Sequence, residues 1–143
     1  MDERKIDWKE CCNRKIAKSV KIDGNMIASL KKSSENKLIS SNELKINEAT
    51  ASSKFILAYD SLREILEALS LKNSFKIYNH ECYTAFLKEI LNQSSKGDDF
   101  DEIRKIRNRI NYYGENISVG EAQVLIIKTI DLRNFILELL NKN

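Results

Sequence analysis

The chain has 143 residues, which suffice for one domain but not for two domains with cores of their own. It has no proline and only four glycines, which disfavours sandwiches, barrels and alternating β/α folds because these need frequent turn residues. The formal net charge of +3 neither requires nor excludes a nucleic-acid partner. Composition therefore predicts an all-α domain.

The compartment and the redox state follow from short signals. No apolar run approaches the ~20 residues of a membrane span, and the first residues lack the apolar stretch of a secretory signal. We expect a cytoplasmic protein with no membrane partner.

Cys11, Cys12 and Cys82 cannot all pair, and the adjacent two are poorly placed to bond each other, so we expect reduced thiols. With one histidine the chain has no zinc-ligand spacing, and we expect no metal and no cofactor.

The first 45 residues predict two helices with an irregular amphipathic pattern. The first covers residues 2–20, and the second covers residues 25–40 with Asp23 as its N-cap. We expect residues 1–45 to form an N-terminal helical extension that packs on a bundle made by residues 46–143, within a single domain overall.

The clearest helix lies in the middle of the chain. Apolar residues recur at the three-and-four spacing of one helical face between Ala51 and Leu69, with Asn47 as the expected N-cap. The pattern breaks at residues 72–78, which predicts a loop. Asn79 then caps a helix of three to four turns that ends near Leu91.

Two further helices complete the prediction. A break at residues 94–97 precedes a helix that ends at Gly114, and Ser118 and Glu121 have the spacing of a capping box at the start of the last helix. Five or six helices joined by short loops predict an antiparallel helical bundle.

One helix face carries a polar seam. Arg107 falls within the apolar face of the predicted fifth helix, and Arg104 and Asn111 lie beside it at three- and four-residue spacing. Guanidinium groups offer paired donors that suit a phosphate or a carboxylate. The alternative is an ion pair between Arg107 and a glutamate of a neighbouring helix, such as Glu64 or Glu67.

The same segment resembles the motif of the HEPN superfamily, closest to archaeal HEPN-type proteins, and reads Arg107-Asn108-Arg109-Ile110-Asn111-Tyr112-Tyr113-Gly114. The similarity covers residues 46–143 and includes the region upstream of the motif, residues 75–87. It implies a HEPN-like bundle of four or five helices that forms a two-fold homodimer with a shared cleft. It also implies RNA or nucleotide binding, or metal-independent cleavage of RNA by a toxin whose antitoxin is a nucleotidyltransferase.

The resemblance assigns roles by motif position. Arg107 would contact a phosphate and Asn108 would be its polar companion. Apart from the resemblance, Arg104 and Asn111 of the polar seam and the neighbouring Arg109 are further candidate binding residues. In a nuclease these residues would act with Tyr112, which occupies the position of the family's catalytic histidine.

That replacement weakens the nuclease interpretation. Histidine titrates near neutral pH and serves as a general base, whereas a phenol ordinarily keeps its proton there. Along an ideal helix, Arg107 and Tyr112 differ by ~7.5 Å in rise and about 140° in direction. We therefore expect them to meet only if the helix unwinds near Asn111 or if a second subunit supplies the facing group. Tyr113 is expected in the core and Tyr112 outside it, and the His80 ring is expected in solvent.

Three functions remain open at this stage. The first is a HEPN-like dimeric module that binds RNA, a nucleotide or a partner protein without cutting it. The second is a metal-independent ribonuclease toxin. The third is a structural dimerisation subunit whose charged seam sets how two bundles dock.

Overall fold

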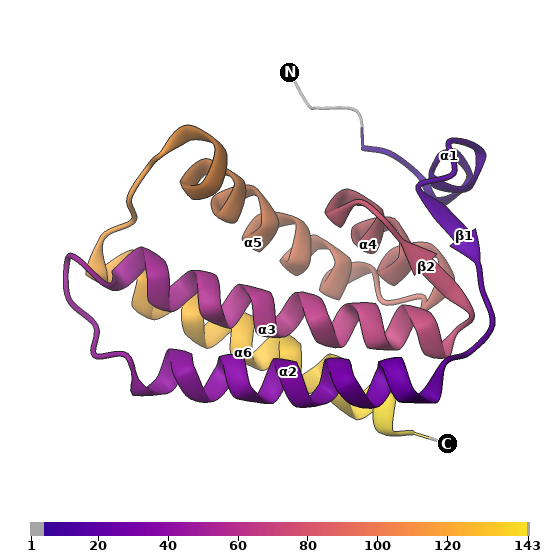
Figure 1. The fold of residues 1–143 in the computed structure, drawn as a ribbon. Helices are drawn as coiled ribbons and strands as arrows, with labels where there is room; N and C mark the ends of the chain where they lie inside the picture. The colour runs from indigo at the N-terminus through magenta and orange to yellow at the C-terminus, as the bar shows by residue number, and fades with distance from the viewer. Residues whose placement is uncertain (1–4, 143) are drawn as a thin grey trace.

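The computed structural model describes residues 5–142, which fold into a helical bundle with a small two-stranded sheet (Figure 1). The all-α bundle expected from composition is confirmed. The elements in chain order are α1 (Trp8–Asn13), β1 (Ala17–Ser19), α2 (Gly24–Glu43), α3 (Ala51–Lys72), β2 (Phe75–Ile77), α4 (His80–Ala85), the π-helical segment η1 (Phe86–Ile90), α5 (Ser94–Tyr113) and α6 (Val119–Asn141).

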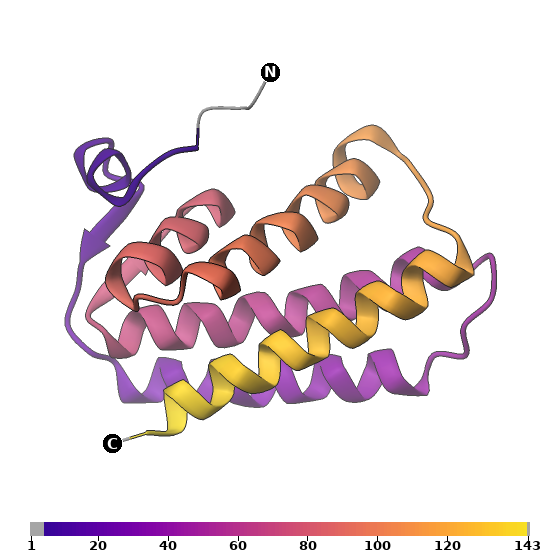
Figure 2. The same cartoon turned by 180° about the vertical axis from the view of Figure 1, so that it is seen from behind.

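Helix α3 is the centre of the bundle. It lies between α2 on one side and α4 and α5 on the other, and α6 crosses α2 and α3 from behind (Figures 1 and 2). The α3 side chains Phe55, Tyr59 and Leu62 are fully buried, as are Phe100 of α5 and Ile136 of α6. Burial of this apolar surface is the main force that holds α5 and α6 against α3.

A buried polar cluster ties α2 to the rest of the bundle. The Ser34 hydroxyl donates to the Ser61 carbonyl oxygen at 2.7 Å, and the Ser61 hydroxyl donates to the Ser34 carbonyl oxygen at 2.8 Å. Arg133 of α6 is only 5% exposed, and its Nε donates to the Ser34 hydroxyl at 3.0 Å. Because these bonds join α2, residues 24–43, to both α3 and α6, α2 packs as one of the long helices of the bundle itself.

The N-terminal segment differs from the expected helix over residues 2–20, of which residues 2–4 lie outside the described part. Only Trp8–Asn13 is helical, and Lys15 then adopts a left-handed backbone with φ 59°. Strand β1 follows and pairs antiparallel with β2, inside the segment 72–78 that was expected to be a loop. Each strand has only three residues, which is too short to show the alternation typical of a strand, and the two strands lie far apart along the chain. The sequence pattern therefore did not predict this pairing.

A disulfide joins Cys11 of α1 to Cys82 of α4, which corrects the expectation of reduced thiols. The two residues are separated by 71 positions, but the fold brings their Cα atoms to 6.1 Å. Three cysteines cannot all pair within one chain, and the one left over is Cys12, a free and exposed thiol. The spacing along the sequence does not tell which two distant cysteines the fold brings together.

Helix termini agree with most of the expected signals. Asp23 and Asn79 cap α2 and α4, Ser118 and Glu121 form the capping box of α6, and Gly114 ends α5 in a left-handed conformation. Two predictions were wrong: α3 has Thr50 as its N-cap, and residues 94–97 form the first turn of α5. Across residues 5–142, every helix is too short or too polar to cross a membrane.

Candidate functional site

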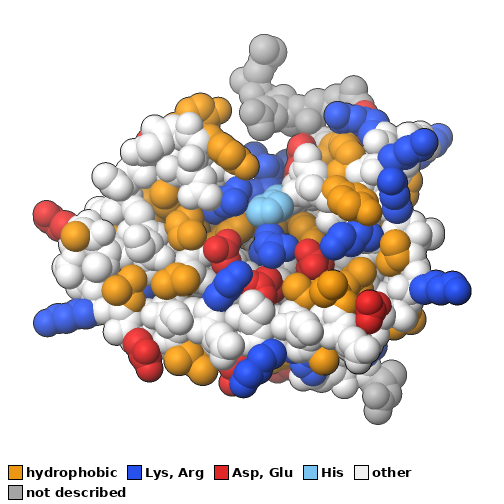
Figure 3. All heavy atoms as spheres, viewed as in Figure 1, with side chains coloured by type: hydrophobic (Ala, Val, Ile, Leu, Met, Phe, Trp, Pro, Cys, Tyr) orange, Lys and Arg blue, Asp and Glu red, His pale blue; other side chains and the backbone are white. Residues whose placement is uncertain are grey.

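A hollow of about 420 Å³ opens between the C-terminal half of α5 and the start of α4. Eight residues line it: Tyr78 and Asn79 after β2, His80 and Glu81 at the start of α4, and Arg104, Arg107, Asn108 and Tyr112 on α5. We call this hollow the arginine pocket. Basic side chains, with acidic ones among them, gather near the centre of the corresponding face in Figure 3.

Arg107 is the half-buried centre of the pocket. Its guanidinium carbon lies 5.4 Å from the centre of the Tyr59 ring and 5.6 Å from that of Tyr112. With the Asn111 amide oriented to satisfy its donors, the Asn111 oxygen accepts from Nε at 3.0 Å and from one terminal nitrogen at 3.1 Å. The aromatic faces and this amide hold the group without neutralising it.

The expected alternative, an ion pair of Arg107 with Glu64 or Glu67, is not formed. Glu64 pairs with Lys37, and Glu67 pairs with Arg63 at 3.0 Å. Within residues 5–142, Arg107 has no carboxylate within ion-pairing distance. Burial raises the pKa of Asp60, and Asp60 lies near enough for the Arg107 charge to lower that pKa in part, but it forms no ion pair with Arg107.

Arg107 and Tyr112 meet within one chain, contrary to the expectation from ideal helix geometry. Helix α5 continues unbroken to Tyr113, and an Nη1 hydrogen of Arg107 points to the Tyr112 hydroxyl at 3.4 Å. Both side chains are long, and side chains on a helix lean toward its N-terminus, so the Tyr112 ring reaches back toward Arg107. Neither unwinding nor a second subunit is needed for this contact.

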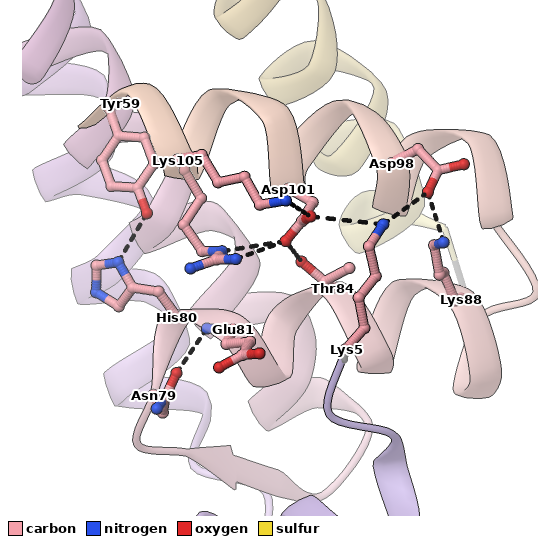
Figure 4. Close-up of polar contacts among 11 residues, drawn as sticks. Lys5, Tyr59, Asn79, His80, Glu81, Thr84, Lys88, Asp98, Asp101 and Lys105 are labelled. Atoms are coloured by element: carbon pink, nitrogen blue, oxygen red, sulfur yellow. Dashed lines mark hydrogen bonds and ion pairs between the residues drawn. The ribbon is translucent and has the colours of Figure 1, made fainter. Parts of the chain in front are cut away.

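Arg104 also lines the pocket, but an acidic neighbour balances its charge. Its Nη2 and Nε donate to Asp101 Oδ1 at 2.7 and 3.2 Å, and Asp101 is only 4% exposed. Lys5 and Lys105 reach the other carboxylate oxygen (Figure 4). Burial alone would raise the pKa of Asp101, but hydrogen bonds and charge from Arg104 and Lys105 outweigh it and lower that pKa.

His80 projects from the first turn of α4 against the core, where the sequence predicted a ring in solvent. It is half-buried, and its ring stacks on Tyr59 with centroids 5.8 Å apart. Burial, with the nearby positive charges of Arg107, Arg63 and Arg104, lowers the pKa of His80 to about 4. The ring is therefore neutral at pH 7.

The tautomer of His80 follows from its contact with Tyr59. The Tyr59 hydroxyl lies 2.7 Å from His80 Nδ1 (Figure 4), and burial raises the pKa of Tyr59 despite the lowering effect of Arg107. A protonated hydroxyl has one hydrogen to donate, and among residues 5–142 its partner is this nitrogen. Nδ1 therefore accepts, and the neutral ring carries its hydrogen on Nε2 as a donor.

The remaining predicted residues lie outside the pocket. Arg109 points away and pairs with Glu115 at 2.6 Å, and Asn111 orients Arg107 but does not line the hollow. Tyr113 was expected in the core, yet it is 77% exposed. It lies near the end of α5, beyond the part of the helix that packs on α3, so the apolar periodicity extends further than the core does.

Half of the pocket comes from residues 75–87, which the HEPN resemblance included but to which the sequence assigned no site residue. Tyr78, Asn79, His80 and Glu81 come from a segment more than twenty residues before the motif. The cap role of Asn79 was predicted and is confirmed, because its side-chain oxygen accepts from the Glu81 backbone N–H. That cap was the available signal that a helix start, with its polar side chains, lies in this region.

Across the described residues, no three His, Cys, Asp or Glu side chains gather as a possible metal site.

No protein-family model matches the chain, and neither a curated protein nor a solved structure matches it. The HEPN resemblance therefore depends on the motif and the helix order alone. The chemistry has to be argued from the pocket.

Proposed function

We propose that the protein binds single-stranded RNA or a nucleotide by holding a phosphate in the arginine pocket, and that it does not cleave it. The observation that carries the proposal is the Arg107 guanidinium, which is half-buried, oriented by Asn111 and without an acidic partner among residues 5–142. A positioned guanidinium is a strong donor to phosphate oxygens.

Neighbouring groups add donors and stacking surfaces. The Nε2 hydrogen of His80 supplies a second donor, because Nδ1 is occupied by Tyr59. Tyr78 is 60% exposed and Tyr112 is 69% exposed, and both line the pocket. Exposed aromatic rings beside a phosphate site are suited to stacking on unpaired bases.

The protonation of the pocket favours binding over cleavage. Metal-independent cleavage needs a group that accepts the proton of the ribose 2′-hydroxyl. His80 is a weak base because its pKa is lowered to about 4, its Nδ1 already contacts the Tyr59 hydroxyl, and Tyr112 stands where the family motif has histidine. Glu81 is the one carboxylate among the residues that line the hollow, so the test below includes it.

The experiment measures binding of fluorescent octauridylate by anisotropy, in EDTA. Arg107→Ala is expected to weaken binding about tenfold to a hundredfold, the equivalent of one lost charge-assisted hydrogen-bonding group. Arg109→Ala is the matched control, because Arg109 lies outside the pocket and pairs with Glu115. Equal binding by the two variants would contradict the proposal.

The same samples test the enzymatic alternative. Incubation of the labelled RNA with the protein is expected to leave it intact. Cleavage that Glu81→Gln or Arg107→Ala abolishes would assign a metal-independent ribonuclease instead. A homodimer and a nucleotidyltransferase antitoxin are further proposals that the HEPN resemblance supports.

A further inference from the structure

A second basic feature lies beside the arginine pocket, on the two-stranded sheet. Lys18 of β1 and Lys76 of β2 are directly opposite each other in the antiparallel register. Their neighbours in the ladder, Ala17 and Ile77, are buried, so strand alternation places the two lysines together on the outer face. Figure 3 shows basic side chains over this edge of the molecule as well.

The strand register sets the two positive charges of this lysine pair opposite each other. Like charges directly opposite on neighbouring strands destabilise the pair. Lys76 has some compensation from Glu67, at 3.7 Å, whereas Lys18 has no carboxylate within ion-pairing distance among residues 5–142. A phosphate between the two ammonium groups would remove the repulsion.

Tyr78 connects the lysine pair to the pocket. The Lys18 and Lys76 ammonium groups lie 5.6 and 5.9 Å from the centre of the Tyr78 ring, and Tyr78 itself lines the arginine pocket. On the other side, Lys18 lines a shallow groove of about 470 Å³ beside β1, together with Lys15 and Ser19. Basic and aromatic groups therefore follow one another from the pocket to the edge of the sheet.

We propose that Lys18 and Lys76 form a second phosphate subsite, so that the ligand is a single-stranded oligonucleotide rather than a mononucleotide. The inference rests on the proposed function, because it extends the strand held at Arg107. One phosphate lies in the arginine pocket, Tyr78 stacks on a base, and a neighbouring phosphate lies between the two lysines. A basic track interleaved with aromatic side chains is the usual design of surfaces that bind single strands.

The test compares octauridylate with uridine monophosphate on the full chain. The double variant Lys18→Gln, Lys76→Gln is expected to bind octauridylate more weakly and uridine monophosphate unchanged. Its salt dependence, as the slope of log affinity against log salt, should become shallower by about 1.4, the effect of two lost phosphate contacts on a single strand. The double variant Lys32→Gln, Lys45→Gln removes the same charge from exposed positions elsewhere and should match the wild type.

The outcomes separate the two proposals. The subsite is refuted if the Lys18/Lys76 variant binds octauridylate as the Lys32/Lys45 control does, or if octauridylate binds no more tightly than uridine monophosphate. In either case, binding of uridine monophosphate that Arg107→Ala abolishes would leave the proposed function intact. Binding of both probes that Arg107→Ala leaves unchanged would refute the proposed function itself.

Discussion

Arg107 is the residue on which the proposed phosphate binding depends. Partial burial of a guanidinium is unfavourable unless its donors are satisfied. Here Asn111 accepts two of the hydrogen bonds, and the rings of Tyr59 and Tyr112 lie close to the cation. These contacts fix the orientation of the group without an ion pair to any described residue, whereas a carboxylate in the same place would have cancelled its charge.

His80 gives the first prediction, on pH. Its pKa in the folded chain is about 4, below the ordinary 6.5, so between these values the unfolded chain binds more protons than the folded chain. The free energy of unfolding should therefore fall as the pH drops from 6.5 toward 4. Urea unfolding at a series of pH values measures this, and His80→Gln should show a shallower fall because the chain has no other histidine.

An NMR titration of His80 checks the cause directly. The imidazole should titrate near pH 4, with its hydrogen on Nε2 above that pH. A ring that titrates near 6.5, or that carries its hydrogen on Nδ1, would contradict the role assigned to the Tyr59 contact.

At this scale the sequence predicted the polar seam but not the pocket. Helical spacing was enough to place Arg107 among apolar residues, because that relation is local. His80 and Glu81 line the same hollow as Arg107 only because α4 packs on α5, which no local pattern encodes. The exposure of Tyr113 was missed because periodicity does not tell where the neighbouring layer ends.

At the scale of elements, α1 and β1 support the segment of residues 78–81 that lines one side of the arginine pocket. Strand β1 pairs with β2, which leads directly into Tyr78 and Asn79. The Trp8 ring packs edge-on against Phe75 of β2, with centroids 5.0 Å apart. The disulfide fixes α1 to α4 two residues after His80. Three independent contacts thus hold the segment that carries half of the pocket.

Loss of the disulfide is the second prediction. Cys11→Ser should lower the free energy of unfolding by about 2–4 kcal/mol, because the crosslink restricts the unfolded chain. Cys12→Ser is the matched control and should change stability by no more than about 0.5 kcal/mol, since that thiol is free and exposed. Denaturant unfolding without reductant measures both.

A reductant provides the complementary measurement. Dithiothreitol should bring the wild type down to the stability of Cys11→Ser and leave that variant unchanged. If the wild type and both variants unfold at the same denaturant concentration, the crosslink does not form in solution. Reducing compartments disfavour such bonds, so the result also bears on the expected cytoplasmic location.

The close packing of Gly97 of α5 against α4 and η1 gives the third prediction. A Cβ added at Gly97 would lie 2.6 Å from Lys88 Cγ and 3.2 Å from the Thr84 carbonyl oxygen. Gly97→Ala should therefore destabilise the protein by about 1–3 kcal/mol through overpacking. Gly120→Ala, also in a helix but with open space around it, should be stabilising by up to about 1 kcal/mol. Thermal unfolding distinguishes the two, and equal shifts would contradict the close packing.

At the scale of the whole molecule, helices α2, α3 and α6 form the scaffold, and α4 and α5 form the arginine pocket on one side of it (Figure 1). The helical class and most helix termini were predictable, because composition, periodicity and caps are properties of local sequence. The β1–β2 pairing and the Cys11–Cys82 bond were not, because both join residues that are distant along the chain.

Assembly is the fourth prediction. The HEPN resemblance leads us to expect a homodimer, with a mass in sedimentation equilibrium of twice 16.5 kDa. If Arg107 serves a ligand, Arg107→Ala should have the same mass as the wild type. A shift of that variant to 16.5 kDa would favour the structural dimerisation subunit, and a wild-type monomer would remove the dimer from the account.

The bond between Cys11 and Cys82 also changes the topology of the chain. It closes a covalent ring that contains all of α2 and α3, and the connection between these helices lies inside that ring. A protease that nicks this connection would leave two fragments still linked, so the cut protein would migrate as one species on a non-reducing gel and as two after reduction. The scaffold helices would stay joined even when the backbone between them is severed.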